Sequence, residues 1–394
     1  MKRTTVALMI AALGVAATGS ASATPGPRSL QRHADALLAQ GAPGVLVEVD
    51  TRRGDIHVRS GYGDTDRRTP VPWNARFRIG SYTKTFVATT VLQLVGEGKL
   101  SLEDTVERWL PGMVAGSGHD GSKITVRQLL QHTSGLHDYV PLMPQLFKEV
   151  DFLRTRFDTV TPRQLVALSL SVPPDFAPGE RWSYSNTGYV LAGMIIERVT
   201  GRSWQREVDR RIVKSLRLGG TSLPGTEAAI PGPHANGYER FPEKGLEADP
   251  EDPRWGEPID VTALNPSWGG AAGEMISTTE DANRFLQALM RGEVLRPAQL
   301  AELRRTVPAP GFAKVWPGAR YGLGVIFIPN ACGGHWSHGG DIMGFMTRNG
   351  VTTDGARSVV VSINTDSMVP EPGAPPHGGD PTFDLVEHAL CDVR

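Results

Sequence analysis

The sequence has little net charge and, beyond its N-terminal segment, no long apolar run, and both absences argue against whole classes of protein. Its 394 residues include 41 lysine and arginine residues against 42 aspartate and glutamate residues, so the formal net charge is −1. Without a basic stripe or a polybasic run, strong attraction to nucleic acid or to anionic lipid is not expected. No stretch after the N-terminal segment is long and apolar enough to cross a bilayer. We therefore expect neither a nucleic-acid partner nor a stable membrane anchor.

The N-terminal segment has the pattern of an export signal. The positive start Lys2–Arg3 precedes an apolar run over residues 6–17, and the small-x-small site at residues 21–23 suits a signal peptidase. A membrane-anchor helix is the alternative, but the run is too short to span a bilayer comfortably. The pattern predicts a signal peptide over residues 1–23 and a secreted, soluble protein from residue 24 onward.

Cysteine is scarce, since the chain has only Cys332 and Cys391. An even count in an exported chain suggests a disulfide, which would tie the last helix to a strand that precedes a glycine-rich motif. Two free buried thiols are the alternative, because two cysteines alone give no spacing signature.

Strand patterns lie near both ends of the chain, and helical patterns fill the middle. The expected strands cover residues 44–49, 54–59, 76–79, 321–328, 335–339, 343–347 and 358–363. The expected helices cover residues 83–96, 187–200, 203–216 and 381–391, with two more that begin at Thr125 and Thr161.

This order predicts an α/β (α+β) fold in which both chain ends build one antiparallel sheet flanked by helices. A mainly helical lobe over about residues 101–259 would be inserted into an α/β lobe of about residues 30–100 and 260–394. Residues 227–258 have the composition of a loop. We expect a single catalytic unit over residues 24–394 and, as the simplest state, a monomer.

The tetrad Ser81-Tyr82-Thr83-Lys84 opens the first apolar helix. A spacing of three places both functional side chains on one helix face. A serine hydroxyl needs a base, and a lysine with a lowered pKa could serve. The helix N-terminus adds positive potential for an oxyanion. Taken alone, the tetrad is a weak signal, because a serine and a lysine three residues apart are usually a helix cap beside a surface lysine. Its place between a strand with Gly80 and an apolar helix favours a buried nucleophile.

A second motif, Ser183-Tyr184-Ser185-Asn186, precedes the helix that begins at Thr187. Tyr184 could transfer the serine proton if a cation lowers its pKa, and Asn186 could hydrogen-bond both the lysine and a substrate carbonyl. The alternative is an asparagine cap beside a packed tyrosine.

The third motif, His338-Gly339-Gly340-Asp341, lies in a strand region. Glycines there would let a substrate backbone approach closely, and the histidine could be a switchable proton donor. A hairpin turn with solvent-facing histidines is the alternative. His335 and His338 would point to opposite faces of a strand, so no metal site is expected.

These three motifs, in this order, resemble the serine β-lactamase and penicillin-binding protein family. Tyrosine in the second motif and histidine in the third are similar to class C β-lactamases and to the extracellular D-alanyl-D-alanine carboxypeptidases of actinobacteria. Further stretches that resemble those carboxypeptidases are His132–Leu136, His234–Tyr238, Trp268, Met275–Thr279, Cys332 and Cys391.

The resemblance implies a role for each motif residue. Ser81 would be the nucleophile, with Lys84 and Tyr184 sharing the proton transfers, and backbone N–H groups of Ser81 and Asp341 would form the oxyanion hole. The implied substrate-binding residues are Asn186, Trp268, His338, Gly339, Gly340 and Asp341. The resemblance further implies a Cys332–Cys391 disulfide, no cofactor, and peptide or acyl substrates together with β-lactams as ligands.

The sequence departs from the carboxypeptidase pattern where that enzyme holds a terminal carboxylate. Its two hydroxyl positions are Gly339 and Asp341 here, and its arginine position is Ile326. Asp341 would repel a carboxylate unless Arg348, on a neighbouring strand, compensates.

Three hypotheses follow. The first is a D-alanyl-D-alanine carboxypeptidase acting on peptidoglycan-type peptides. The second is an esterase, D-amino-acid amidase, D-aminopeptidase or β-lactamase with the same catalytic residues. The third is an inactive module that binds penicillin or the cell wall. Asp341 favours the amidase and aminopeptidase, because a free substrate amine could pair with it.

Overall fold

The computed structural model describes residues 27–244, 254–370, 374 and 379–393. The predicted signal peptide, residues 1–23, lies outside these residues, so both it and secretion stay predictions. Within the described part of the chain, no helix has the length and apolar character needed to span a membrane.

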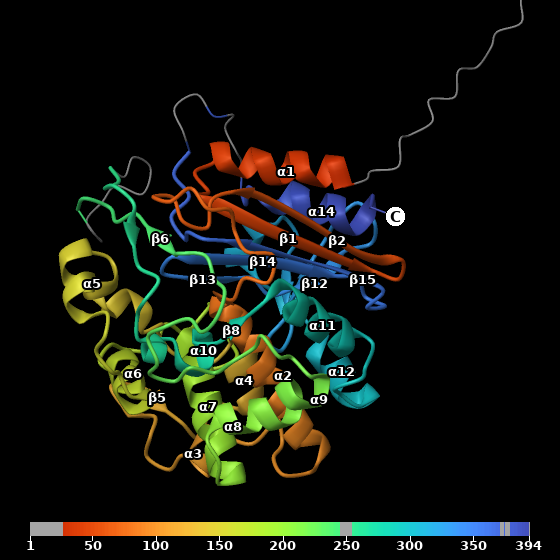
Figure 1. The fold of residues 1–394 in the computed structure, drawn as a ribbon. Coiled ribbons are helices and arrows are strands. Elements are labelled where there is room, and N and C mark those ends of the chain that lie inside the picture. The colour runs from red at the N-terminus through yellow and green to blue at the C-terminus, as the bar shows by residue number, and fades with distance from the viewer. Residues whose placement is uncertain (1–26, 245–253, 371–373, 375–378, 394) are drawn as a thin grey trace, which may run out of the picture.

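A nine-stranded sheet joins the two ends of the chain (Figure 1). Its order is β2-β1-β15-β14-β12-β11-β10-β9, with β13 also paired to β14. Every pairing is antiparallel, and β1 lies beside β15 with Val45 opposite Ile363. The strands are β1 Gly44–Thr51, β2 Gly54–Gly61, β9 Val307–Pro308, β10 Arg320–Tyr321, β11 Ile326–Ile328, β12 His335–Ser337, β13 Gly340–Ile342, β14 Phe345–Val351 and β15 Arg357–Ile363. The predicted antiparallel sheet built from both chain ends is confirmed.

Helices cover both faces of this sheet. The helices α1 Pro27–Ala39 and α14 Phe383–Cys391 pack on one face over alternating valines of β1 and β15. The helix α11 Thr279–Met290 packs on the other. This alternation follows from the two-residue period of a strand, which sends successive side chains to opposite faces.

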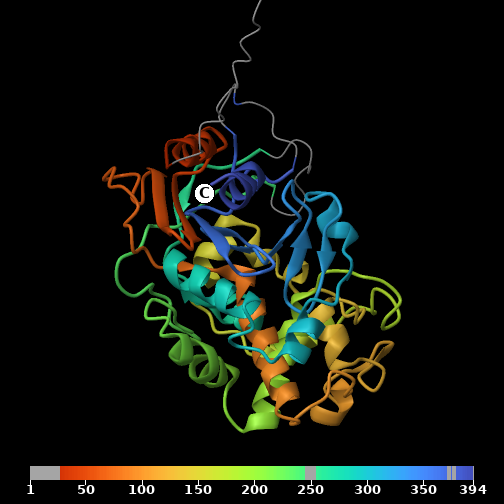
Figure 2. The ribbon, with the colours of Figure 1, turned by 90° about the vertical axis from the view of Figure 1, so that its right-hand side faces the viewer.

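The middle of the chain is mostly helical and lies together below the sheet (Figures 1 and 2). The remaining helices are α2 Thr83–Gly96, α3 Val106–Trp109, α4 Val126–Gln131, α5 Glu149–Thr155, α6 Pro162–Ser169, α7 Asn186–Thr200, α8 Trp204–Val208, α9 Lys214–Leu216, α10 Gly270–Gly273, α12 Pro297–Leu303 and α13 Pro310–Ala313. The short strands outside the main sheet are β3 Phe77–Arg78, β4 Ala115–Gly116, β5 His119–Asp120, β6 Tyr238–Glu239, β7 Ile259–Asp260 and β8 Ile276–Ser277.

Local sequence signals set several helix ends as predicted. Thr125 and Thr161 begin α4 and α6 in complete capping boxes, each with a glutamine three residues later. Gly201, with a φ of 68°, closes α7 in the left-handed conformation.

Two predicted elements are interrupted. The strand expected over residues 321–328 is a tight hairpin instead, because Gly324 (φ 76°) turns the chain and Tyr321 pairs with Ile326. The helix expected over residues 203–216 contains a π-helical turn at Asp209–Val213, between α8 and α9.

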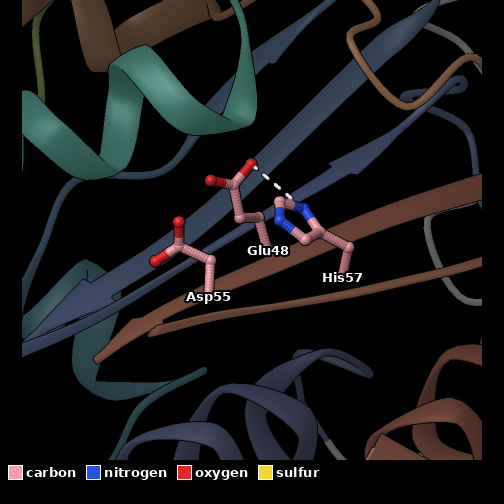
Figure 3. Close-up of side chains that lie close together, drawn as sticks. All are labelled: Glu48, Asp55 and His57. Atoms are coloured by element: carbon pink, nitrogen blue, oxygen red, sulfur yellow. Dashed lines mark ion pairs between the residues drawn. The ribbon is translucent and has the colours of Figure 1, made fainter. Parts of the chain in front are cut away.

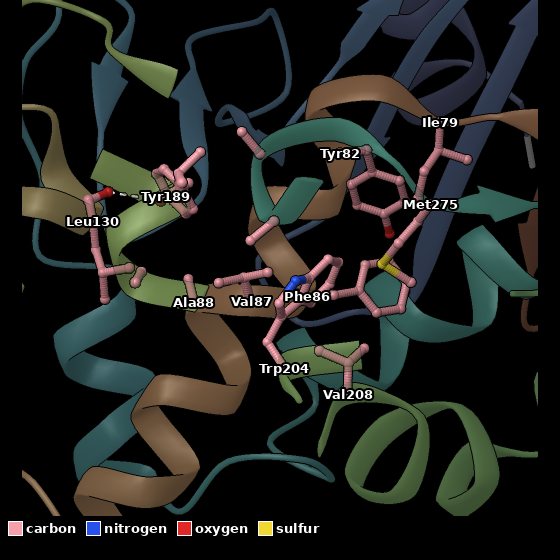
Figure 4. Packing of buried hydrophobic residues seen from close by; sticks show 14 of the residues in the cluster. Ile79, Tyr82, Phe86, Val87, Ala88, Leu130, Tyr189, Trp204, Val208 and Met275 are labelled. Carbon is pink, nitrogen blue, oxygen red and sulfur yellow. Dashed lines mark hydrogen bonds between the residues drawn. The ribbon is translucent and has the colours of Figure 1, made fainter. Parts of the chain in front are cut away.

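The helix α2 is buried on all sides (Figure 4). Phe86 stacks on Phe285 of α11 with ring centroids 3.8 Å apart, and the Tyr82 hydroxyl donates a hydrogen bond to the Ala282 carbonyl at 3.0 Å. A helix enclosed by apolar side chains all round is part of the core. Side chains near its first turn are therefore held on a rigid support.

The two cysteines form a disulfide that ties α14 to the turn between β11 and β12, as expected. Cys332 and Cys391 have Cα atoms 5.6 Å apart and are separated by 59 residues. We predict that the Cys332→Ser/Cys391→Ser variant loses about 4 kcal/mol of unfolding free energy, since a loop of this length restrains the unfolded chain. Urea unfolding with and without reductant measures the loss, and the double variant should not respond to reductant. Equal midpoints for reduced and oxidised wild type would contradict the prediction.

Candidate active site

The turn that carries Ser81 packs directly against β13. Gly80 has a φ of 51°, and Gly80–Tyr82 forms a short 3-10 helix that leads into α2. A Cβ atom on Gly340 would lie 1.9 Å from the Ile79 carbonyl oxygen and 2.7 Å from the Ser81 nitrogen. One on Gly80 would lie 2.8 Å from the Asp341 nitrogen. Two glycines thus let the backbones at Ser81 and Asp341 lie side by side.

Lys84 is fully buried, and its amine faces the Ser81 hydroxyl. The Nζ atom lies 2.9 Å from Ser81 Oγ, 2.7 Å from Asn186 Oδ1 and 2.8 Å from the Ala272 carbonyl oxygen. Burial lowers the pKa of Lys84 to about 7, against an opposing effect of Asp138 and Asp341. A neutral amine has two N–H donors and one lone pair. The two carbonyl acceptors occupy its donors, so the lone pair is directed toward the serine.

Tyr184 approaches the same oxygen from the loop before α7. Its hydroxyl donates a hydrogen bond to Ser81 Oγ at 2.9 Å. Burial raises the pKa of Tyr184 well above its ordinary value, with only partial relief from the bond to Ser81. The phenol therefore stays protonated, and its geometry suits a proton donor better than a base.

Asp138 is a site residue that the sequence analysis missed. Its carboxylate accepts hydrogen bonds from Asn186 Nδ2 at 3.2 and 3.0 Å and from the Asn186 backbone N–H at 3.3 Å. These bonds orient the amide so that its oxygen faces Lys84. Asp138 lies two residues beyond the turn His132–Leu136, but that position alone does not indicate its bond to Asn186.

His338 needs a correction. It was expected to be a switchable proton donor at the substrate, but its ring is buried and does not line the cavity described below. Its Nδ1 atom lies 2.7 Å from the Gly339 carbonyl oxygen, and its Nε2 atom lies 2.9 Å from the Tyr321 hydroxyl. Burial lowers the pKa of His338 to about 3, so the ring is neutral. His338 instead fixes the backbone that precedes Gly340.

A cavity of about 160 Å³ opens beside Ser81. Besides Ser81, its polar lining includes the side chains of Asn186, Asp341 and Asp366. Its apolar wall includes Tyr139, Val140, Leu146, Phe147, Trp268 and Met343. The structure therefore brings the predicted Asn186, Trp268 and Asp341 to one cavity with Ser81, whereas Gly339 lies outside the lining.

The charge at the third motif is balanced within the protein. Arg348 donates hydrogen bonds to Asp341 at 2.5 Å and to Asp380 at 2.7 Å. Ile326 is buried in an apolar cluster beside Tyr321. The cation proposed as compensation is thus already bonded to two carboxylates.

One group of side chains in the described part of the chain has ligand atoms that could hold a metal, and none of its members lines this cavity. Glu48 of β1 faces His57 and Asp55 of β2, with all three ligand atoms within 4.8 Å of one another (Figure 3). Glu48 already accepts a hydrogen bond of 2.6 Å from Thr279. This contact joins the sheet to α11.

The sequence model of the β-lactamase family matches residues 30–377. The chain belongs to the β-lactamase family. Similar members of known structure include a D-stereospecific amidohydrolase from Streptomyces sp., with a TM-score of 0.81 and 39% identity, covering 93% of this chain and 99% of that one.

Curated relatives of this β-lactamase-family chain carry different names. Penicillin-binding protein 4* of Bacillus subtilis (strain 168) is 39% identical over 153 residues, which are 38% of this chain and 32% of that protein. The chain thus spans about a third of that relative's length. Esterase EstB of Burkholderia gladioli is 29% identical over 324 residues, or 75% of this chain and 79% of that protein. The predicted resemblance and fold are confirmed, and the family includes penicillin-binding, esterase and amidase homologues.

The close approach of Gly340 to the serine turn generates a first prediction for the site. Gly340→Ala should abolish hydrolysis and lower the unfolding free energy by about 1–3 kcal/mol, because the added methyl group forces the two backbones apart. Gly219→Ala is the matched control, since a Cβ there meets nothing within 4 Å. Activity and thermal melts measure both variants. A fully active Gly340→Ala protein would contradict this packing.

The buried amine generates a second prediction. Because the pKa of Lys84 is lowered to about 7, activity should rise as pH increases through about 7 and the amine loses its proton. Asp138 raises this pKa, so Asp138→Asn should move the rising limb to lower pH. Asp209→Asn, at a distant surface ion pair with Lys214, should leave the limb in place. A limb that stays fixed in Asp138→Asn would contradict the assignment.

Proposed function

We propose that the protein is a D-stereospecific amidohydrolase that forms an acyl-enzyme on Ser81. The observation that carries the proposal is the charge of the cavity: Asp341 and Asp366 line it, while Arg348 is bonded to Asp341 and Asp380. Carboxylates favour a substrate with a free ammonium group and disfavour a terminal carboxylate. The similarity to the Streptomyces D-stereospecific amidohydrolase over nearly the whole chain supports this choice.

In the first step, Ser81 attacks the amide carbonyl carbon while Lys84 accepts the hydroxyl proton. The lone pair of Lys84 faces Ser81 Oγ at 2.9 Å, which is hydrogen-bonding distance. The backbone N–H groups of Ser81 and Asp341 would stabilise the oxyanion. In comparable sites, each such donor lowers the activation barrier by about 3 kcal/mol.

In the second step, the C–N bond breaks and the leaving nitrogen takes a proton through the Tyr184 hydroxyl. Tyr184 suits this role because it remains a phenol and lies 2.9 Å from the serine oxygen. Lys84 gives the proton that it accepted from Ser81 to the Tyr184 oxygen, so Tyr184 is again a phenol and Lys84 is again a neutral amine. Attack of water on the acyl-enzyme then releases the acid and restores the serine.

The carboxypeptidase hypothesis stays a second candidate, supported by the order and chemistry of the three motifs. It would require a cation for the substrate's terminal carboxylate, and Arg348 serves it only if Asp341 and Asp380 release that side chain. The esterase hypothesis is supported by the similarity to EstB. Under each of these hypotheses, penicillin would acylate Ser81.

A substrate panel tests the proposal. Wild type should hydrolyse D-phenylalanine amide much faster than L-phenylalanine amide or an acylated D-Ala-D-Ala peptide, because only the first combines a free amine with the proposed stereochemistry. Ser81→Ala should abolish turnover of every substrate, and intact mass measured after penicillin treatment should show no adduct. Cleavage of the acylated peptide but not the amide would establish the carboxypeptidase instead. Cleavage of a nitrophenyl ester alone would establish the esterase.

A further inference from the structure

Asp366 is an unpaired carboxylate in the cavity that contains Ser81. It follows β15 and lines the cavity together with Ser81 and Asp341. Among the described residues, no hydrogen bond or ion pair reaches its carboxylate. The charged side chains that act on it from a distance are Asp341, Glu239 and Arg348. No sequence motif pointed to it.

The position of Asp366 is fixed by its neighbours and not by its own side chain. The Tyr238 N–H donates a hydrogen bond to the Asn364 carbonyl at 2.9 Å, and the Arg240 N–H donates one to Ser367 Oγ at 2.7 Å. Asp366 is thus held between two bonded residues of the same segment. Its carboxylate is left available to a ligand in the cavity.

The charges that face Asp366 come from three strands. They are Asp341 of β13, Glu239 of β6 and Arg348 of β14. Arg348 is already bonded to Asp341 and Asp380. Acidic side chains therefore outnumber basic ones near Asp366, and a cationic group entering the cavity would be stabilised once Asp366 has lost its proton.

We propose that Asp366 binds the α-ammonium group of the substrate, and that this contact selects amides of amino acids with a free amine. This inference rests on the proposed amidohydrolase function. Asp341 is the weaker candidate because Arg348 occupies it. The ammonium group lies one carbon from the reacting carbonyl, so its partner must share the cavity with Ser81. The apolar wall around Phe147 and Trp268 would receive the substrate's side chain.

Binding of an ammonium group at Asp366 should depend on pH. Burial and the neighbouring carboxylates Asp341 and Glu239 raise the pKa of Asp366 well above its ordinary value. Asp366 must lose its proton to pair with an ammonium group, so affinity for an amine should increase as pH rises. Lys84 also loses its positive charge as pH rises, which would favour an amine as well. A variant that lacks only the Asp366 carboxyl separates the two effects.

The first test compares D-phenylalanine amide with 3-phenylpropanamide, which lacks the amine, and with nitrophenyl butyrate. Asp366→Asn should lower kcat/KM for D-phenylalanine amide by about 10- to 100-fold, chiefly through KM. Turnover of the other two compounds should change less than about twofold. Asp384→Asn, at an exposed position of α14, is the matched control and should behave as wild type.

The second test measures binding of D-phenylalaninol, an amine that has no carbonyl to attack, by calorimetry between about pH 5 and about pH 8. Affinity for wild type should rise with pH, and the Asp366→Asn profile should be flatter. Binding to wild type should release a proton, seen as a dependence of the heat on the buffer, and the variant should release less. Asp366→Ser, which also lacks the carboxyl, replaces Asp366→Asn if that variant fails to fold.

Each result bears on one proposal. If wild type hydrolyses the ester but neither amide, the proposed function fails, and tight binding of D-phenylalaninol would still support the ammonium site. If wild type hydrolyses both amides equally well, or Asp366→Asn lowers all three activities alike, the assignment of Asp366 is overturned. Buffer-independent heats and equal pH profiles for both proteins overturn it as well.

Discussion

The contact between the Lys84 amine and the Ser81 hydroxyl is the constraint on which the rest of the site depends. A lysine buried without an ion pair holds its proton poorly, and that loss is what makes its lone pair available near neutral pH. Burial alone would leave the amine free to rotate. The Asn186 oxygen and the Ala272 carbonyl fix its two donors, so residues from α7 and α10 orient a side chain of α2.

The position of Ser81 also depends on a sheet built from both chain ends. The proposed nucleophile lies early in the sequence and β13 lies late, yet Gly80 and Gly340 bring their backbones closer than any side chain would allow. Pairing of β1 with β15 provides the frame in which that approach is possible. The disulfide between Cys332 and Cys391 and the helices α1 and α14 stabilise this frame from the far face.

Sequence reasoning recovered the features that local chemistry determines. The capping boxes at Thr125 and Thr161, the glycine stop at Gly201 and the Ser-x-x-Lys spacing each depend on a few neighbouring residues. The helix α1 and the Tyr321–Ile326 hairpin were missed although each has a local signal. Leu30, Ala34 and Leu37 recur at helical spacing, and Gly324 turns the chain. Asp138 was missed for a different reason: its function lies in a hydrogen bond to Asn186, and nothing in its own neighbourhood in the sequence indicates that partner.

At the third motif, the charges of His338 and Arg348 could not be predicted from the sequence. A histidine in this motif indicates a titrating group in water, but burial beside Tyr321 leaves His338 neutral and makes it a support for the backbone. The sequence likewise suggests Arg348 as a free cation, but in the fold it forms ion pairs with Asp341 and Asp380. Residue types alone therefore predict the reactive oxygen and its base, whereas the preference for a substrate charge depends on which ionised groups already have partners. That pairing is a property of the tertiary structure, and the residue types of the three motifs do not determine it.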